Sequence, residues 1–385
     1  MKQLIIINQP FPFKTGGTEV KLANQVRQLK KKGVEVTIFA SKSEKKKSFF
    51  TDLKVDIRNI GLEHKTYNGF LPFKLIYWFM VQFSFIVGAI WYSRWIIFDI
   101  IEVKDPYSGI AGVFAKWFSD KPLILETAGA FGPKMRKLYV MKYGKFVAGI
   151  LYFFMNSIEK FVYTRCDAII TEDNISKRLK ELGFKGLYKR IPNGVDTSEF
   201  KKKFVSKRKK VILYVGRLDK EKNVMFIVDN FDKIKERISN AILVIVGSGT
   251  EKLPIKKDVF YEGFKTNTID YYNIADVLVM ASHYESLPCV VLEAMACEVP
   301  VVCTNVGMMS EVIDNRFLYN LKDGTFVSKV VKAIKNKDRL GKNALKTIKE
   351  KFDWNELINR YLEVYNKIFY QQDVDKGWLE VAEGD

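Results

Sequence analysis

The feature that most constrains the fold of this chain of 385 residues is an alternation of apolar runs with helix-like segments, which occurs twice. In the first half, a segment with helical periodicity at 19–32 follows an apolar run, and the expected strands are 4–8, 35–39, 97–103, 123–126 and 168–171. In the second half, a helix is expected at 292–297, and the expected strands are 211–215, 241–246, 259–261, 277–280 and 299–303. Two such alternations predict two α/β domains, each built on a parallel sheet.

The boundary between the two domains is expected between residues 191 and 210. Pro192-Asn193-Gly194 forms a turn, and the run KKKFVSKRKK at 201–210 carries too much charge for a core. We therefore predict a first domain at 1–192 and a second at 193–366. Residues 367–385 complete a last helix at 355–369 and add an acidic tail, and we expect this part to return towards the first domain.

The charge of the chain is unevenly distributed. The formal net charge is +19, and residues 1–200 carry 32 Lys or Arg against 18 Asp or Glu. Such an excess favours an anionic partner, which could be a nucleic acid, an acidic membrane surface or a phosphorylated substrate. A hydrophobic content of 48% excludes a wholly disordered or collagen-like chain.

Cysteine and histidine narrow the possible chemistry. Cys166, Cys289, Cys297 and Cys303 have neither the spacing of a metal site nor that of a disulfide framework, which indicates a reducing compartment. Only two histidines are present, so a multi-histidine zinc centre has almost no ligands to use. The chemistry must depend mainly on carboxylates, cations and backbone groups.

Two segments of the first half are candidates for contact with a membrane. Residues 75–93 contain no charged side chain and are long enough to span a bilayer. A single crossing would separate the strands 4–8 and 99–103, which belong to one predicted sheet, so a buried or membrane-surface helix is favoured over a span. Residues 136–160 mix basic and aromatic side chains, a composition suited to lipid headgroups.

Candidate ligand-binding residues follow the strands, because open parallel sheets bind ligands beyond the carboxyl ends of their strands. Gly16 and Gly17 lie between the first strand and the first helix, where they could let the backbone approach an anion or simply form a tight turn. Arg217 and Lys222 follow the strand 211–215. Two cations there could clamp a diphosphate, or they could belong to a solvated turn.

The segment 282–296 carries the strongest signal. Glu285 lies in a loop, and Glu293 lies eight positions later, one turn into an apolar helix. Carboxylates accept hydrogen bonds from vicinal hydroxyls, and free amides at a helix start bind phosphate, so one loop could hold both the sugars and the diphosphate of an activated sugar. Alone, two glutamates could also be an accident of the surface.

Five motifs in this order resemble the retaining glycosyltransferases of family 4. They are GGTE, IPNGVDTSEF, YVGRLDKEKN, VIVGSGTEK and ESLPCVVLEAMACEVPVV, and the resemblance extends from Ile5 to about Tyr370. The resemblance implies the α/β fold called GT-B, with two Rossmann-like parallel-sheet domains facing across a cleft. The second domain would mainly hold a nucleotide sugar and the first the acceptor, with no metal and no cofactor.

The resemblance also assigns roles to particular residues. Glu285 would contact the transferred sugar, and Arg217 and Lys222 the departing diphosphate; we take these three as catalytic. The remaining donor-binding positions would contact the ribose, the base and the phosphates; they are Gly16, Gly17, Gly249, Glu262, Ser286, Leu287, Pro288, Cys289, Val290 and Glu293. Among them Glu293 would hold the ribose hydroxyls.

The chain departs from the family pattern on the acceptor side. Glu102 and Lys104 stand where the family often has histidines, and we take them as acceptor-side candidates. Another common histidine is absent from the segment 126–129, which reads ETAG. Retaining transfer in the family is thought to occur on the front face, with the leaving diphosphate receiving the acceptor proton, so activity does not require a histidine base.

The expected protein is therefore a retaining, metal-independent glycosyltransferase. It would use a UDP- or GDP-sugar and a lipid-linked or cell-surface glycan acceptor, and it would lie in the cytoplasm, peripheral on an anionic membrane surface. One alternative is a catalytically silent protein that binds sugar nucleotides or membrane surfaces on the same fold. A second is a basic nucleic-acid-binding protein, for which the sequence contains no recognition motif.

Overall fold

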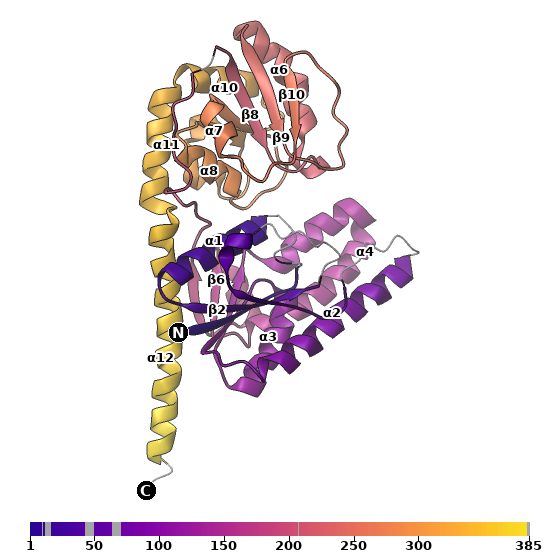
Figure 1. Ribbon diagram of the computed structural model, residues 1–385. Coiled ribbons are helices and arrows are strands. Elements are labelled where there is room, and N and C mark those ends of the chain that lie inside the picture. Colours follow the sequence, from indigo (N-terminus) through magenta and orange to yellow (C-terminus); the bar gives the residue numbers. More distant parts are fainter. Residues whose placement is uncertain (10, 12–16, 43–49, 64–70, 207, 383–385) are drawn as a thin grey trace. The chain divides into compact units, whose positions relative to one another are not determined.

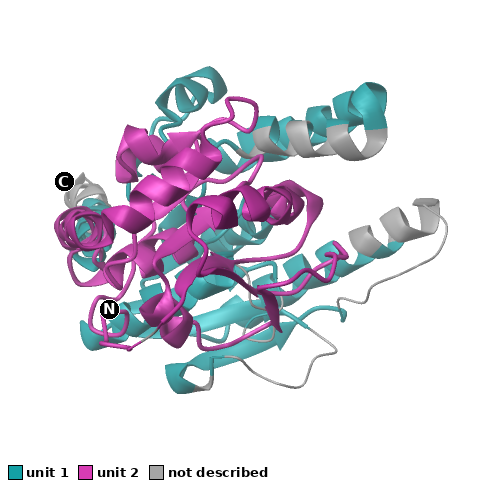
Figure 2. Ribbon diagram, turned by 90° about the horizontal axis from the view of Figure 1, so that it is seen from above, with its two compact units in different colours: residues 1–191, 358–385 teal, residues 192–357 magenta. Residues whose placement is uncertain are grey.

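The computed structural model describes residues 1–9, 11, 17–42, 50–63, 71–206 and 208–382, and Figure 1 shows the chain. The chain forms two compact units, which Figure 2 distinguishes by colour. Unit 1 comprises residues 1–191 and 358–385, and unit 2 comprises residues 192–357. Each unit contains one parallel sheet, as the alternation of apolar runs and helices predicts.

The sheet of unit 1 has seven strands in the order β3-β2-β1-β4-β5-β6-β7. Central strands such as β1 are buried over almost their whole length, whereas the edge strands β3 and β7 are mostly half-buried. The strands are β1 (Lys2–Ile7), β2 (Glu35–Ser41), β3 (Asp56–Ile60), β4 (Ile100–Val103), β5 (Leu123–Thr127), β6 (Ala168–Thr171) and β7 (Leu187–Arg190).

The helices of unit 1 cover both faces of this sheet. They are α1 (Gly17–Lys31), α2 (Leu71–Ser93), α3 (Pro106–Ser119), α4 (Phe131–Tyr163), α5 (Ser176–Leu182) and α12 (Trp354–Ala382), with a 3-10 turn at Thr51–Leu53. Alternate strand residues such as Leu4, Val103 and Leu125 pack with Phe85 of α2 and Val162 of α4 in one apolar core. Helices α2, α3 and α4 therefore cover one face. Helix α4 is broken at Gly144, which has a backbone φ of 79°.

The opposite face of the same sheet carries buried polar side chains among buried apolar ones such as Ile5, Ile100 and Ile124. Glu102 of β4 and Glu126 of β5 point to this face, where they meet residues of α1 and α12. Tyr361 donates a hydrogen bond of 2.6 Å to Oε1 of Glu126, and Tyr365 donates one to Oε2 of Glu102. These two tyrosines attach α12 to the first sheet.

Unit 2 has a six-stranded sheet in the order β10-β9-β8-β11-β12-β13. Its strands are β8 (Lys210–Val215), β9 (Ala241–Val246), β10 (Val259–Gly263), β11 (Val277–Met280), β12 (Val301–Thr304) and β13 (Leu318–Tyr319). Its helices are α6 (Val224–Arg237), α7 (Ile269–Ile274), α8 (Cys289–Ala296), α9 (Met309–Val312), α10 (Phe326–Lys335) and α11 (Lys337–Lys351), with 3-10 turns at Lys220–Lys222 and Asn315–Phe317. Apolar side chains from both faces of the sheet form one core.

Some boundaries differ from the sequence-based expectation. The second domain was expected to end at residue 366, whereas unit 2 ends at Leu357, because the buried tyrosines of α12 pack into unit 1. The strand expected at 97–103 begins only at Ile100. Among the described residues, no helix combines the length and the apolar character that crossing a membrane requires, and α2 is no exception.

Candidate active site

The sheet of unit 2 has its topological switch point between β8 and β11, which lie side by side. From β8 the chain continues to β9 and β10 on one side, while β11 leads to β12 and β13 on the other. The carboxyl ends of strands at such a point open a crevice in which α/β proteins bind ligands. Arg217 and Lys222 follow β8, and Glu285 follows β11, so the sheet brings these three predicted residues to one crevice.

Backbone hydrogen bonds join the loops at this edge. The amide of His283 donates to the carbonyl of Glu221 at 2.9 Å, which connects the loops after β11 and β8. The amide of Met308 donates to the carbonyl of Ser286 at 3.0 Å, which connects the loops after β12 and β11. The site is therefore formed by loops that support one another.

Glycine allows two of these loops to approach closely. A Cβ on Gly307, where φ is +56°, would lie 2.2 Å from the carbonyl oxygen of Glu285. A Cβ on Gly247, where φ is +146°, would lie 1.8 Å from the carbonyl oxygen of Gly216. Any other residue would force these loops apart.

Lys222 and Glu285 form the central ion pair of the site. Nζ of Lys222 lies 2.6 Å from Oε1 of Glu285, and both side chains are largely buried. Ser282 donates a hydrogen bond of 2.9 Å to the same oxygen. The resemblance implies contact with the transferred sugar for Glu285 and with the diphosphate for Lys222, and the structure holds these two side chains together.

Arg217 lies at the same edge but is more exposed. Its guanidinium pairs with Asp219 and with Glu221, which are two and four positions further along the chain. A diphosphate that bound Arg217 would have to compete with these two carboxylates. Asp219 is itself fixed, because it accepts hydrogen bonds from the amide and hydroxyl groups of Thr250.

Glu293 is held by a tyrosine. Tyr272 of α7 is fully buried, and its hydroxyl donates a hydrogen bond of 2.6 Å to Oε2 of Glu293 on α8. Burial raises the pKa of Glu293 to about 7, even though the hydrogen bond from Tyr272 favours the charged form; the nearby Glu199 raises the pKa further. The carboxyl group therefore changes its charge near neutral pH.

The other predicted donor-binding residues of unit 2 lie around this edge. Gly249 follows β9 against the backbone of Leu218, and Glu262 of β10 accepts a hydrogen bond of 2.9 Å from Tyr271. The loop residues Ser286, Leu287 and Pro288 lead into α8, which begins with Cys289 and Val290. Buried Asn193 donates to the carbonyl of Leu287 at 3.3 Å and to Sγ of Cys289 at 3.0 Å.

The site residues predicted in unit 1 lie in different environments from one another. Gly16 lies outside the described residues, and Gly17 is the first residue of α1. Glu102 is completely buried, and its carboxylate oxygens accept hydrogen bonds from Gln3, Gln25, Lys104 and Tyr365. As a correction to the sequence-based expectation, Glu102 lies in the interior of unit 1.

Lys104 belongs to the same buried network. It pairs with Glu102 and Glu126, while Lys21 of α1 lies 2.7 Å from Glu126 and 2.8 Å from Glu172. Burial would raise the pKa of Glu126, but the two lysines hold it well below its usual range. Burial raises the pKa of Glu102 in spite of Lys104, with the neighbouring Glu126 adding to the shift. Lys104 is thus also an interior residue.

Several residues of the site were not found by sequence reasoning. Ser282 donates a hydrogen bond to Glu285, and Tyr272 donates one to Glu293. Gly307 lets the loop after β12 approach the backbone of Glu285 closely. No local pattern marks Tyr272, because its contact with Glu293 depends on how α7 packs beside α8. Asp219 and Glu221 were detectable, since carboxylates two and four positions after an arginine at a strand end are natural partners for it.

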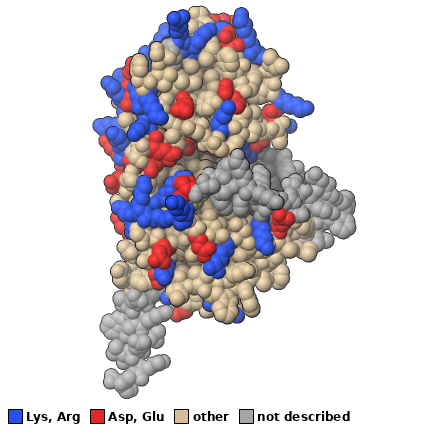
Figure 3. Space-filling view, viewed as in Figure 1, with Lys and Arg blue, Asp and Glu red and all other residues tan. Residues whose placement is uncertain are grey.

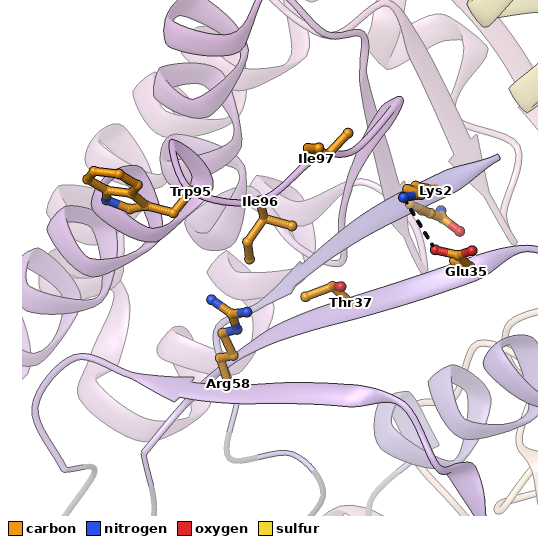
Figure 4. A pocket seen from close by; sticks show the side chains of 8 residues that line it. Lys2, Glu35, Thr37, Arg58, Trp95, Ile96 and Ile97 are labelled. Carbon is orange, nitrogen blue, oxygen red and sulfur yellow. Dashed lines mark ion pairs between the residues drawn. The ribbon is translucent and has the colours of Figure 1, made fainter.

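A separate pocket of about 320 Å³ opens in unit 1 at the amino ends of β1 and β2, and Figure 4 shows its lining. Thr37 and Arg58 come from adjacent strands there, and Lys2 lies 3.7 Å from Glu35. The pocket is at the edge opposite to the carboxyl ends of the strands, so it does not belong to the candidate site.

Comparison with known proteins identifies the family. The profile described as Glycosyltransferase Family 4 matches residues 15–199, and the profile described as Glycosyl transferases group 1 matches residues 195–350. The chain belongs to glycosyltransferase family 4. The family assignment confirms the resemblance that the five motifs carry, and the protein is a glycosyltransferase.

Several curated glycosyltransferases are similar to this one. The capsular polysaccharide biosynthesis glycosyltransferase CapM of Staphylococcus aureus is 25% identical over 93% of this chain and 95% of its own length. The UDP-Gal:alpha-D-GlcNAc-diphosphoundecaprenol alpha-1,3-galactosyltransferase of Escherichia coli is 23% identical over 70% of this chain and 75% of its own length. N-acetyl-alpha-D-glucosaminyl L-malate synthase of Bacillus anthracis is 29% identical over 44% of this chain, and the chain spans about half, 49%, of that relative.

Solved structures confirm the fold of this glycosyltransferase. Sucrose-phosphate synthase from Thermosynechococcus elongatus superposes with a TM-score of 0.75 over 96% of this chain and 100% of its own, at 17% identity. HepE of Anabaena in complex with UDP-glucose superposes with a TM-score of 0.68 over 94% of this chain and 99% of its own, at 15% identity. The fold is GT-B, with two parallel-sheet α/β domains.

Proposed function

We propose that this glycosyltransferase transfers a sugar from a nucleoside diphosphate sugar to a lipid-linked or cell-surface glycan acceptor, with retention of the anomeric configuration and without a metal ion. The observation that carries the proposal is the Lys222–Glu285 pair at the switch point of the second sheet, with Arg217 beside it. The names of the galactosyltransferase of E. coli and of CapM support the acceptor class.

The proposed chemistry follows from the charges at this edge. In the reaction, the acceptor oxygen bonds to the anomeric carbon, the bond from that carbon to the diphosphate breaks, and the acceptor proton passes to the departing phosphate oxygen. Lys222 and Arg217 would stabilise the negative charge that develops on the diphosphate, which is the task that a metal ion performs elsewhere. Glu285 would then be released from Lys222 to contact the transferred sugar.

The donor-binding roles are assigned from the same geometry. Glu293, held by Tyr272, would accept hydrogen bonds from the ribose hydroxyls. The amides of Cys289 and Val290 are the first of helix α8 and would donate to phosphate oxygens. Gly249 and Glu262, at the ends of β9 and β10, would lie beside the base.

The first experiment identifies the donor. Thermal unfolding is measured against a panel of UDP-, GDP- and ADP-sugars, because a ligand at one hundred times its Kd stabilises the folded state by about 2.7 kcal/mol. A UDP- or GDP-sugar is expected to raise Tm, with and without a chelator. The proposal fails if no nucleotide sugar shifts Tm.

The second experiment tests the residue roles. Lys222→Gln should lower kcat more than it weakens donor binding, because charge on the diphosphate grows towards the transition state. Lys220→Gln is the matched control, since Lys220 lies in the same 3-10 turn but is exposed. Equal kcat in both variants would mean that Lys222 belongs to an ordinary solvated turn.

A further inference from the structure

The outer side of helix α2 is apolar although it faces solvent. Val81, Phe85 and Ala89 lie on its inner side and are buried in the core of unit 1. The opposite side carries exposed large apolar residues at helical spacing; they are Met80, Phe83, Val87 and Trp91, of which Phe83 is 70% exposed. A helix that covers a sheet normally presents polar residues to water, so α2 needs a second apolar partner.

Helix α4, on the same face of the sheet, repeats this arrangement. Its inner residues Ala148, Met155 and Val162 are buried. Its outer side exposes Phe146, Ile150, Phe153 and Phe154, with Phe146 82% and Phe153 68% exposed. Exposed apolar residues that occur singly are normal, but two stripes on one helix layer form an extended surface of the kind that marks an interaction site.

The charges of the two segments that carry these stripes are nearly all positive. The segment 71–98 contains no acidic residue, and the segment 131–163 contains six basic residues and one acidic residue, Glu159. Glu159 is fully buried and lies 2.6 Å from Arg178. The exposed charged side chains described on α4 are Arg136, Lys145 and Lys160, and Arg94 follows α2; exposed acidic residues lie on the neighbouring helices, Asp120 at the end of α3 and Glu181 on α5. Figure 3 shows mostly uncharged residues over α2 and α3.

Arginines also lie over aromatic rings at this surface. The guanidinium carbon of Arg94 is 4.5 Å from the ring centre of Phe118, and that of Arg136 is 5.2 Å from the ring centre of Tyr152. Aromatic rings beside cations are the composition that favours the boundary between lipid headgroups and acyl chains.

We infer that the outer side of α2 and α4, here called the α2–α4 surface, docks on an anionic lipid membrane, inserting its aromatic side chains between the headgroups. A second copy of the chain is a poorer partner, because a twofold contact would bring the same cationic surface against itself. The inference deepens the proposed function and rests on it for its purpose, since docking would bring the enzyme to a lipid-linked acceptor.

Vesicle flotation of the full chain tests the docking. Binding to vesicles of phosphatidylcholine with phosphatidylglycerol is expected at low salt, with weaker binding at high salt and to phosphatidylcholine alone. Replacing Phe146 and Phe153 by serine should weaken binding at least about tenfold, because each removes one inserted ring. Arg136→Gln with Lys145→Gln should weaken it by roughly fivefold per charge at low salt.

The matched control is a pair of exposed apolar residues in unit 2. Phe204 and Ile255 are 95% and 100% exposed, and replacing both by serine should leave vesicle binding unchanged. Quenching of tryptophan fluorescence by lipids with brominated acyl chains reports insertion into the membrane without substitution of Phe146 or Phe153. The fluorescence of Trp91 should be quenched on binding, and Trp91→Phe should remove that part of the signal.

The outcomes separate docking from the proposed function. Binding of UDP- and GDP-sugars is measured without vesicles, and vesicle binding is measured without nucleotide sugars. If the protein binds a nucleotide sugar but not anionic vesicles, the docking is overturned and the proposed function stays intact. If it binds anionic vesicles but no nucleotide sugar, only the proposed function is overturned. The docking is also overturned if the control pair weakens flotation as much as the Phe146 and Phe153 pair. If the protein does not bind vesicles but associates with itself, and replacing Phe146 and Phe153 abolishes this self-association, the α2–α4 surface is a protein interface instead and the docking is overturned.

Discussion

The raised pKa of Glu293 predicts a particular pH dependence of stability, which Glu293→Gln should remove. The folded state raises this pKa from its ordinary 4.5 to about 7, which corresponds to about 3 kcal/mol of free energy at roughly 1.4 kcal/mol per unit. Because the folded state holds the proton more tightly than the unfolded state, stability is full at low pH. It falls as the pH rises from 4.5 through 7.

Glutamine keeps an oxygen that can accept the hydrogen bond from Tyr272 but cannot ionise. The difference in unfolding free energy between Glu293→Gln and the natural protein should therefore grow by about 3 kcal/mol between acidic pH and pH 8, in favour of the variant. For a domain of this size the difference corresponds to a rise in Tm of roughly 6–12 °C at pH 8.

Thermal unfolding of donor-free protein over a series of pH values measures this effect. Glu236→Gln is the control, because Glu236 is exposed on α6. The unfolding free energy of this variant should not rise relative to that of the natural protein between pH 4.5 and 7. A constant difference between Glu293→Gln and the natural protein at all pH values would refute the reasoning that burial of Glu293 disfavours its charged form.

The same group should control donor affinity if it holds the ribose. The ionised carboxylate accepts hydrogen bonds from both hydroxyls, so donor affinity of the natural protein should fall as the pH drops below about 7, by up to tenfold per pH unit. Isothermal titration with the donor that raises Tm measures it. A Kd that does not change with pH would mean that Glu293 does not bind the ribose hydroxyls.

Three further predictions concern the interiors of the two units. Tyr361→Phe removes the 2.6 Å hydrogen bond to Glu126 and should destabilise unit 1 by about 1.5–3 kcal/mol in denaturant unfolding, whereas Tyr370→Phe, at an exposed position of the same helix, should change little. Lys104→Met leaves two buried carboxylates short of a partner and should cost about 3–5 kcal/mol; a loss below 1 kcal/mol would mean that the network is not coupled. Gly247→Ala should abolish donor binding or folding of unit 2, because its Cβ would meet the carbonyl oxygen of Gly216 at 1.8 Å. Gly324→Ala, with φ of +66° and no atom within 4 Å of a Cβ, should cost only about 1–2 kcal/mol and keep donor binding.

Sequence reasoning missed three of the four edge strands, whereas β10, the fourth, was predicted at 259–261. Strands β3, β7 and β13 were not predicted, and each lies at an edge of its sheet. β3 reads DIRNI and β7 reads LYKR, because an edge strand is half-buried and does not need a continuous apolar run. β13 has only two residues, too few for any periodicity.

The sequence by itself determined the central strands and the motif at the carboxyl edge of the sheet of unit 2. Buried parallel strands require continuous apolar runs, and the positions of Arg217, Lys222 and Glu285 are fixed by the short loops that follow β8 and β11. Such local patterns can be read along the chain.

Only the tertiary structure decided the setting of Glu102, Lys104 and Glu293. Tyr365 contacts Glu102 across 263 positions, and Tyr361 contacts Glu126 across 235, so the buried polar cluster on the first sheet is complete only once α12 packs against it. The pKa of Glu293 likewise depends on the packing of α7 beside α8. From the sequence alone, a charged residue is expected at the surface, because burying a charge is unfavourable unless other groups pair with it or donate hydrogen bonds to it. For these residues the partners lie far away in the sequence, so only the folded structure reveals them.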